Sequence, residues 1–316
     1  MIPLVLKNGI FRAEIVSEIG GNIISLRHLP SRTKLLREPA DLRELERFPE
    51  QFGLPVLFPP NRIEDGRFTF EGRSCQLPVN ETAMHNHLHG LVVNKPWNLV
   101  SHTEYSAELT CDFTPRNSEY EGFPFSFTLK RELTLTGNGL TDRMTVTNRG
   151  KWNMPLGLGY HSTFPANPAQ VRLGAGKDQF EIGERYLPTG RHFAWGETDP
   201  RKWFDPTGIN AGFHMKAEPL ILEDGNSFHG AEIRYESGLL RYITDEKFGF
   251  WYTWNRRGQG DFISLEPVSW MANALNQPGP PEETGVRVLA PSSEITFLNE
   301  LRFAAEMDRV SASCFG

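Results

Sequence analysis

Cysteine is scarce in this sequence of 316 residues, where it occurs only as Cys75, Cys111 and Cys314. An odd number of widely separated cysteines provides neither a disulfide framework nor the paired spacing of a zinc site. No stretch approaches the roughly 18 apolar residues of a membrane helix, and residues 1–8 lack the basic start and apolar run of a signal peptide. We therefore expect reduced thiols, no membrane partner and a cytoplasmic protein.

An excess of basic charge is also missing. The formal net charge is −6, and the charged residues are scattered, so we expect no nucleic-acid partner. Several catalytic patterns are absent as well. The glycines of residues 137–139 are not followed by the Lys-Ser/Thr of a phosphate loop, and neither a Gly-x-Ser-x-Gly turn nor a His-Glu-x-x-His helix occurs.

Turn-forming residues, by contrast, are abundant, with 29 glycines and 23 prolines. Apolar and polar side chains alternate through residues 123–146, on both sides of the turn at 137–139, which predicts a long antiparallel hairpin with one face in water. The only helical pattern is short and charged, at residues 38–52. Further strands or hairpins are predicted at residues 10–27, 67–77, 250–255, 261–270 and 294–303. We expect an all-β protein, a large sandwich that forms a single domain over residues 1–316.

Residues 261–270 predict a short apolar strand that delivers one carboxylate. The period of two places Glu266 on the same face as Phe262 and Val268, and Pro267 is expected to stop the strand directly after Glu266. A glutamate in this position is ion-paired, solvated at the strand end, or held in a pocket that raises its pKa. A general base near neutral pH requires the last arrangement, and this stretch alone leaves all three open.

Histidines stand at alternate positions in residues 85–90. On a strand, His85, His87 and His89 would share one face, and with Glu266 they would suit a divalent-metal site of the cupin kind. A polar loop of surface histidines has the same pattern, and spacing alone does not separate the two interpretations.

His161 lies in residues 157–165, a run of glycines and aromatic residues. This setting fits either a catalytic imidazole or a hydrogen-bonded histidine of the core. Arg62, which follows two prolines and an asparagine, is suited to bind sugar hydroxyl groups or a carboxylate, or to form an ion pair with Glu64 or Asp65.

Four short motifs follow one another along the chain. They are Asn-Arg-Ile with Gly-Arg-Phe at residues 61–68, Asn-His-Leu-His-Gly at 86–90, His-Ser-Thr-Phe at 161–164 and Leu-Glu-Pro at 265–267. In this order they resemble the motifs of the aldose 1-epimerase (galactose mutarotase-like) family. The resemblance covers residues 10–303, nearly the whole chain. Each motif alone is weak, whereas four in the correct order are fairly specific.

The resemblance implies a large distorted antiparallel β-sandwich of the galactose mutarotase-like kind. It also implies interconversion of the α and β anomers of a hexose without a metal or other cofactor. Glu266 would then be the general base at the C1 hydroxyl group, and His161 the general acid at the ring oxygen. His89 and Arg62 would hydrogen-bond the sugar, with Asn61 supporting the loop. The protein would bind a small sugar as a monomer or homodimer.

This sequence departs from the family's pattern at the residue that grips the sugar hydroxyl groups. His214 stands where the family has an aspartate, with Asp205 or Asp224 as substitutes in space. His87 replaces a small polar residue and would line the site. These changes concern the substrate more than the reaction.

Other functions stay open. A phosphorylated hexose would require a basic cluster, for which Arg62, Arg67 and Lys95 are the candidates. The chain is alternatively a catalytically inactive carbohydrate-binding protein of the same fold. A third possibility is a cupin-like metalloenzyme whose ligands would be His87, His89 and Glu266.

Overall fold

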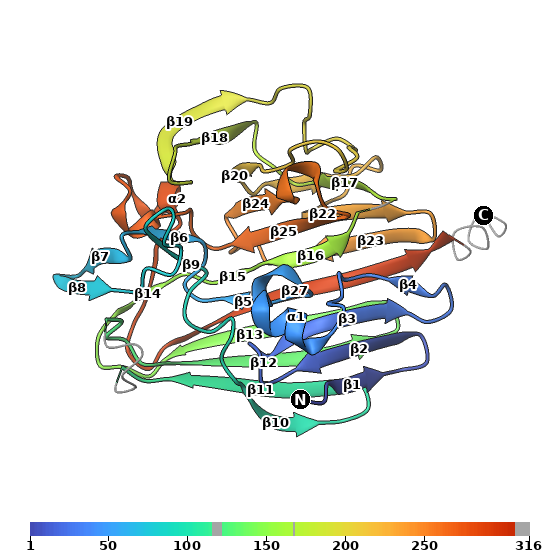
Figure 1. The fold of residues 1–316 in the computed structure, drawn as a ribbon, viewed down its shortest axis with the longest axis horizontal. Coiled ribbons are helices and arrows are strands. Elements are labelled where there is room, and N and C mark those ends of the chain that lie inside the picture. Colours follow the sequence, from blue (N-terminus) through green and yellow to red (C-terminus); the bar gives the residue numbers. More distant parts are fainter. Residues whose placement is uncertain (116–121, 167, 307–316) are drawn as a thin grey trace.

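The computed structural model describes residues 1–115, 122–166 and 168–306, and Cys314 lies outside these ranges. Neighbouring strands run antiparallel, in one sheet of nine strands and in smaller sheets that pack against it (Figure 1). The predicted all-β antiparallel sandwich is confirmed. Within the described ranges, no helix has the length and apolar character needed to cross a membrane.

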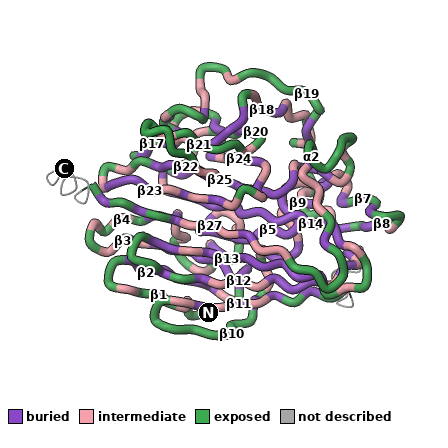
Figure 2. Tube along the Cα trace, turned by 180° about the vertical axis from the view of Figure 1, so that it is seen from behind, coloured by how far each residue is buried: buried purple, intermediate pink, exposed green. Residues whose placement is uncertain are grey.

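The nine-stranded sheet forms one layer, in the order β10-β11-β12-β13-β27-β23-β22-β17 with β21 paired to β22. Its strands are β10 (Asn98–His102), β11 (Ser106–Phe113), β12 (Phe127–Thr136), β13 (Gly139–Asn148), β17 (Gln170–Leu173), β21 (Pro219–Ile221), β22 (Ser227–Tyr235), β23 (Gly238–Ile243) and β27 (Glu294–Ala305). The predicted hairpin is therefore β12–β13. Seen from behind, the edge strand β10 is exposed along its length, whereas the central β13 is largely buried (Figure 2).

Two sheets make up most of the second layer. A four-stranded sheet contains β1 (Leu4–Lys7), β2 (Phe11–Val16), β3 (Asn22–His28) and β4 (Thr33–Lys34). A six-stranded sheet in the order β20-β24-β25-β15-β5, with β16 also paired to β25, carries the candidate site. Its strands are β5 (Val56–Leu57), β15 (Gly159–Tyr160), β16 (Ser162–Pro165), β20 (His214–Lys216), β24 (Phe250–Trp254) and β25 (Phe262–Val268).

Short hairpins and helical turns surround these sheets. The two-stranded pairs are β6 (Arg62–Glu64) with β9 (Asn86–Leu88), β7 (Arg67–Phe70) with β8 (Arg73–Gln76), β14 (Met154–Leu156) with β26 (Arg287–Leu289), and β18 (Asp178–Ile182) with β19 (Pro188–Ala194). The helical turns are α1 (Leu42–Arg47), η1 (Pro49–Gln51), η3 (Arg256–Gly258), η4 (Ala274–Asn276) and α2 (Pro281–Thr284). The predicted helical region thus contains α1, which begins where the Asp41 side chain accepts hydrogen bonds from two backbone amides, and η1.

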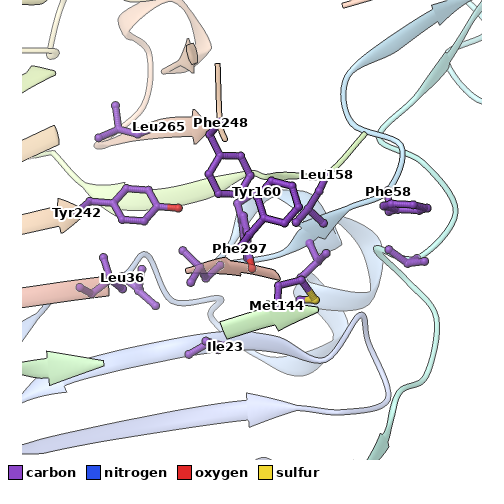
Figure 3. Packing of buried hydrophobic residues seen from close by; sticks show 14 of the residues in the cluster. Ile23, Leu36, Phe58, Met144, Leu158, Tyr160, Tyr242, Phe248, Leu265 and Phe297 are labelled. Carbon is purple, nitrogen blue, oxygen red and sulfur yellow. The ribbon is translucent and has the colours of Figure 1, made fainter. Parts of the chain in front are cut away.

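Aromatic rings join the two layers. Tyr242 of β23 lies with its ring centroid 5.6 Å from that of Phe164 and 6.1 Å from that of Trp251, both in the six-stranded sheet. Phe248 similarly contacts Phe297 of β27, at 5.0 Å (Figure 3). Such offset and edge contacts add to the free energy of burying the rings, so the six-stranded sheet rests on a firmly packed base.

A buried ion pair lies within the apolar face of the β12–β13 hairpin. Arg131 Nη2 contacts Asp142 Oδ2 at 2.6 Å, and both side chains are almost fully buried. The guanidinium also donates to the backbone oxygens of Gly21, at 2.7 Å, and Leu54, at 3.1 Å, both in the opposite layer. The polar face departs from the prediction in β13, because Thr145 and Thr147 are buried beside β27.

The strand that carries Glu266 does not stop at the following proline. β25 continues through Pro267 to Val268 and pairs with β24 from Ser264 to Val268. On the other side, its ladder is interrupted between the pairs Gly159↔Val268 and Ser162↔Leu265. Pro267 faces this interruption, so a ladder position without an N–H donor is tolerated there.

Candidate active site

Strand register places three polar side chains in one row. His214 of β20 pairs with Tyr252 of β24, and Tyr252 pairs with Glu266 of β25. Directly opposed residues of antiparallel strands project to the same face of a sheet, so these side chains share a face. The rings of His214 and Tyr252 lie with centroids 4.7 Å apart at an interplanar angle of 83°.

His161 reaches Glu266 from the neighbouring strands. It sits between β15 and β16, where the ladder with β25 is interrupted, and its Nε2 atom lies 3.1 Å from Oε1 of Glu266. The side chains are only 5% and 6% exposed. The two groups therefore touch directly, and no gap of the size of a sugar separates them.

Burial shifts the two pKa values of this pair in opposite directions. It raises the pKa of Glu266 to about 8, against the opposing effect of the nearby Arg62 charge. Burial also lowers the pKa of His161 to about 4, and the charges of Arg62 and Arg37 act in the same direction. Between these values the pair holds a single proton, which Glu266 and His161 share.

Two further rings surround His161. The His89 ring lies perpendicular to it, with centroids 5.2 Å apart, and the Trp254 ring lies at 5.9 Å. Burial lowers the pKa of His89, with the neighbouring His161 and Arg62 as further causes, so His89 is neutral at physiological pH. Its Nδ1 atom is buried without a hydrogen-bond partner among the described residues. An unpaired nitrogen of this kind is free to bind a polar ligand group.

Arg62 is held by a carboxylate that the sequence did not indicate. Its Nη2 atom lies 2.7 Å from Oε1 of Glu81, and its Nε atom donates to both oxygens of that carboxylate. The predicted partners Glu64 and Asp65 are instead bound by Arg185. The prediction was wrong because Glu81 reaches Arg62 through the β6–β9 pairing, which the linear order conceals.

Asn61 shapes the loop on which Arg62 lies. Its backbone has a φ of 57°, and its side-chain oxygen accepts a hydrogen bond of 2.9 Å from the Arg62 amide. Its carbonyl oxygen accepts from the His89 amide at 3.1 Å. Asparagine tolerates this left-handed conformation better than most residues, so it connects the strand ends bearing Arg62 and His89.

The histidines of residues 85–90 do not share a face. Positive φ values at His85 and His89 bracket the short strand β9. His85 is exposed and contacts Asp65, whereas Nδ1 of His87 lies 2.8 Å from the Pro78 carbonyl oxygen. Among the described residues, no three His, Cys, Asp or Glu side chains are grouped to hold a metal ion. The predicted common histidine face was wrong because the backbone turns at both ends.

His214 is at the site, whereas the alternative aspartates are not in contact with it. Its Nδ1 atom is buried without a partner in the described chain, and burial, with the Arg62 charge, lowers its pKa to about 3. Asp205 accepts hydrogen bonds within its own turn from Thr207. Asp224 does the same for Asn226 in an exposed turn.

The proposed basic cluster for a phosphate does not form as predicted. Arg67 hydrogen-bonds Gln76 across the exposed β7–β8 hairpin. Lys95 lies near Cys111, where burial and the Asp112 charge raise the pKa of the thiol and the Lys95 charge acts against them. Other cations occupy the neighbourhood instead. Arg37, whose charge acts on His161, packs over the Phe262 ring at 3.9 Å from its centroid. No local sequence signal marks Arg37, because strand packing alone brings it there.

Comparison with known proteins assigns the family. The family model described as aldose 1-epimerase matches residues 4–216, about two thirds of the chain. The chain therefore belongs to the aldose 1-epimerase family, as the motifs predicted. The match includes Arg62, His89 and His161 but ends before Glu266, which contacts His161 in the folded protein.

Similar proteins agree with this assignment. The uncharacterized protein YphB of Escherichia coli K12 is 28% identical over 251 residues, which cover 77% of this chain and 80% of YphB. A galactose mutarotase-like protein from Clostridium acetobutylicum superposes with a TM-score of 0.90 and 25% identity, covering 96% of this chain and 95% of its own. The galactose 1-epimerase of Lactobacillus acidophilus NCFM shares the fold, with 16% identity and a TM-score of 0.75. The superposition covers 96% of this chain and 94% of that protein. The fold is thus the galactose mutarotase-like β-sandwich.

Proposed function

We propose that this protein is a mutarotase, which interconverts the α and β anomers of a hexose by opening and closing the sugar ring. The observation that carries the proposal is the buried contact of 3.1 Å between His161 and Glu266, which holds one proton over the neutral pH range. General acid–base catalysis needs such a pair, with one member able to accept a proton while the other donates.

The reaction uses both members at adjacent atoms of the sugar. The reactive form arises when the proton shared by the pair passes from Glu266 to His161 across their contact. Glu266, now a carboxylate, takes the proton of the C1 hydroxyl group, while His161, now an imidazolium, protonates the ring oxygen. The bond from C1 to the ring oxygen breaks, the C1–C2 bond turns, and closure on the other face of the carbonyl gives the other anomer. The two reacting oxygens are both bonded to C1, so a pair of groups in mutual contact reaches both. On closure, the two residues exchange roles.

Neighbouring side chains are placed to hold the sugar. The Arg62 charge already favours the ionised form of Glu266, and it stabilises negative charge that develops on the sugar oxygens. Since its Nε and Nη2 atoms bind Glu81, its Nη1 atom is available to a ligand. The unpaired Nδ1 atoms of His89 and His214 bind hydroxyl groups, and His87 lies near enough to His89 to contribute to lowering its pKa. His214 thereby takes the place of the family's aspartate.

The site draws its residues from Asn61 to Glu266. It combines the β6–β9 hairpin with the six-stranded sheet, and the larger sheet supports both. We therefore assign residues 1–316 to a single aldose 1-epimerase domain that acts on a small sugar without a further cofactor.

Polarimetry tests the proposal. The rotation of freshly dissolved α-glucose and α-galactose is followed with the wild-type protein, without protein, and with Glu266→Gln. The wild-type protein should accelerate the decay, and the substitution should reduce the rate by a factor of roughly 10² to 10⁴, the usual contribution of a general base. If no sugar were converted faster, the chain would be a sugar-binding protein without turnover, and the mutarotase proposal would be wrong.

A metal-dependent alternative is tested with the same assay. Dialysis against EDTA should leave the rate of the wild-type protein unchanged, because protein side chains supply both proton transfers. A loss of activity that a divalent cation restores would favour the metalloenzyme instead.

A further inference from the structure

The turn between β18 and β19 is attached to the active site by one arginine. Arg185 contacts Glu64 through Nη1 and Asp65 through Nη2, each at 2.8 Å, and its Nε atom donates to the Met84 carbonyl oxygen at 2.9 Å. These partners lie in or next to the paired strands β6 and β9, which carry Arg62 and lead to His89. The β18–β19 hairpin, at the top of Figure 1, is thus fixed to the sugar-binding elements at its turn.

The next residue in this turn, Tyr186, covers the central cation of the site. Its ring centroid lies 4.8 Å from Cζ of Arg62, and its hydroxyl group accepts a hydrogen bond of 3.3 Å from Nη2 of Arg257. Tyr186 is 37% exposed and has a φ of 58°, a conformation that a tyrosine rarely adopts. Arg257 and the Tyr186 hydroxyl group therefore stand on the solvent side of Arg62.

The arginine turn that bears Arg257 is held in an unusual conformation. Arg256 and Arg257 both have positive φ values, 51° and 56°. Asn255, which is fully buried, supports the turn by accepting a hydrogen bond from the Gly258 amide and by donating to the backbone oxygens of two residues of the 206–209 segment. Strained backbone of this kind persists where the surrounding structure holds it, and it concentrates at functional sites.

The cations around the site differ in how their charges are balanced. Arg62 is paired with Glu81, and Arg185 with two carboxylates. In the described part of the chain, Arg257 has no carboxylate partner, and its Nη2 atom donates to the Tyr186 hydroxyl group. Arg256 also pairs with no carboxylate among the described residues; it donates to the side-chain oxygen of Gln51 at 3.0 Å and packs near aromatic rings. Within the described ranges, no carboxylate pairs with Arg256 or Arg257, so the solvent side of the site presents unbalanced positive charge.

We propose that Arg257 and the Tyr186 hydroxyl group form a specificity site for a negatively charged substituent of the sugar. The preferred substrates are then hexoses that carry a phosphate or carboxylate group, whose oxygens match the planar fork of a guanidinium. The anion would bind Arg257 while the reducing end reaches Glu266 and His161. This inference rests on the proposed mutarotase function and defines its class of substrate.

Exchange NMR at chemical equilibrium tests this specificity, because it measures anomer interconversion without pure anomers. Glucose, glucose 6-phosphate and glucuronate are compared with the wild-type protein and with Arg257→Gln, Arg257→Lys and Tyr186→Phe. We expect a higher kcat/KM for a charged sugar than for glucose, and a loss of about tenfold with Arg257→Gln, as for a hydrogen bond to a charged group. The kcat/KM for glucose should be unaffected by Arg257→Gln, and Arg257→Lys should retain part of the preference for charged sugars.

A matched control removes an arginine elsewhere. Arg143 is exposed on β13 of the nine-stranded sheet, so Arg143→Gln makes the same change in net charge away from the site. This variant should change the kcat/KM of neither charged nor uncharged sugars. The two charged sugars show whether phosphate or carboxylate is preferred. The inference is wrong if charged sugars react no faster than glucose, or if Arg257→Gln slows glucose equally.

Failure of the mutarotase proposal would be recognised separately. If the wild-type protein accelerates no sugar, calorimetric titration with glucose 6-phosphate and glucuronate decides the inference by itself. Binding that weakens about tenfold in Arg257→Gln would support the anion site without turnover. Absence of binding, or equal binding by both proteins, would overturn it.

Discussion

Replacing Glu266 by glutamine should remove activity and at the same time make the protein more stable. The carboxyl group has a pKa of about 8 in the folded protein, against 4.5 for the same group exposed to water. In the window from 4.5 to about 8, the unfolded chain loses the proton while the folded protein retains it. The contribution of Glu266 to the free energy of unfolding is therefore most favourable below pH 4.5 and is lost as the pH rises towards 8.

The size of this effect follows from the two pKa values. At pH 7, two and a half units above the unfolded value, ionisation favours the unfolded chain by about 3 kcal/mol, and at pH 5 by about 1 kcal/mol. Glutamine has the shape of the protonated carboxyl group and does not ionise. Its amide donates to Nε2 of His161, as the protonated carboxyl group does. The free-energy advantage of Glu266→Gln should therefore grow by about 2 kcal/mol between pH 5 and pH 7.

Urea denaturation at both pH values measures this difference. His161 titrates in the same range, but burial and the charges of Arg62 and Arg37 set its pKa, so its contribution is common to both proteins. Glu223→Gln, in an exposed turn, is the control and should show no such change. A stability difference between Glu266→Gln and wild type that stays constant from pH 5 to pH 7 would refute the assignment of a buried, proton-retaining carboxyl group.

Two further predictions concern the pH profile and the core. The rate of mutarotation, corrected for the uncatalysed reaction, should be bell-shaped between limbs near pH 4 and pH 8, because only the singly protonated pair of Glu266 and His161 is active; a rate that rises steadily to pH 9 would contradict this. Asp142→Ala should lower the free energy of unfolding by roughly 3 to 5 kcal/mol, since it leaves Arg131 charged and buried without its partner. Urea denaturation checks the second prediction, the double variant with Arg131→Met should recover part of the loss, and a loss near zero for the single variant would show that water reaches Arg131.

Local patterns were sufficient for most of the strands. Alternation in residues 123–146 predicted the β12–β13 hairpin because a strand with one covered face must alternate apolar and polar residues. Runs of strand-forming residues, bounded by turn residues in the first case, located β2–β3 and β27. The expectation that Pro267 ends β25 was wrong, because the break between β15 and β16 that accommodates this proline depends on a neighbouring strand.

Partners of the charged residues could not be derived in the same way. Glu64 and Asp65 are the nearest carboxylates to Arg62 along the chain, yet Glu81 binds it and Arg185 takes the other two. Ion pairs depend on distance in space, and here hairpin pairing and a distant turn set that distance. The prediction that the alternate histidines share one face was wrong for a related reason, because the positive φ values at His85 and His89 interrupt the period of two.

By itself, the sequence determined that the protein is an antiparallel β-sandwich, and it singled out Glu266 and His161 as the residues to examine. Both follow from short-range information, the alternation of side chains and the order of short motifs. Only the tertiary structure decided that these two residues touch, that burial moves their pKa values apart, and that the Arg62 charge acts on both. It also decided that Tyr186 contacts Arg62 and Arg257 contacts Tyr186. Contact and desolvation depend on how distant strands pack, and that packing is a property of the folded chain as a whole.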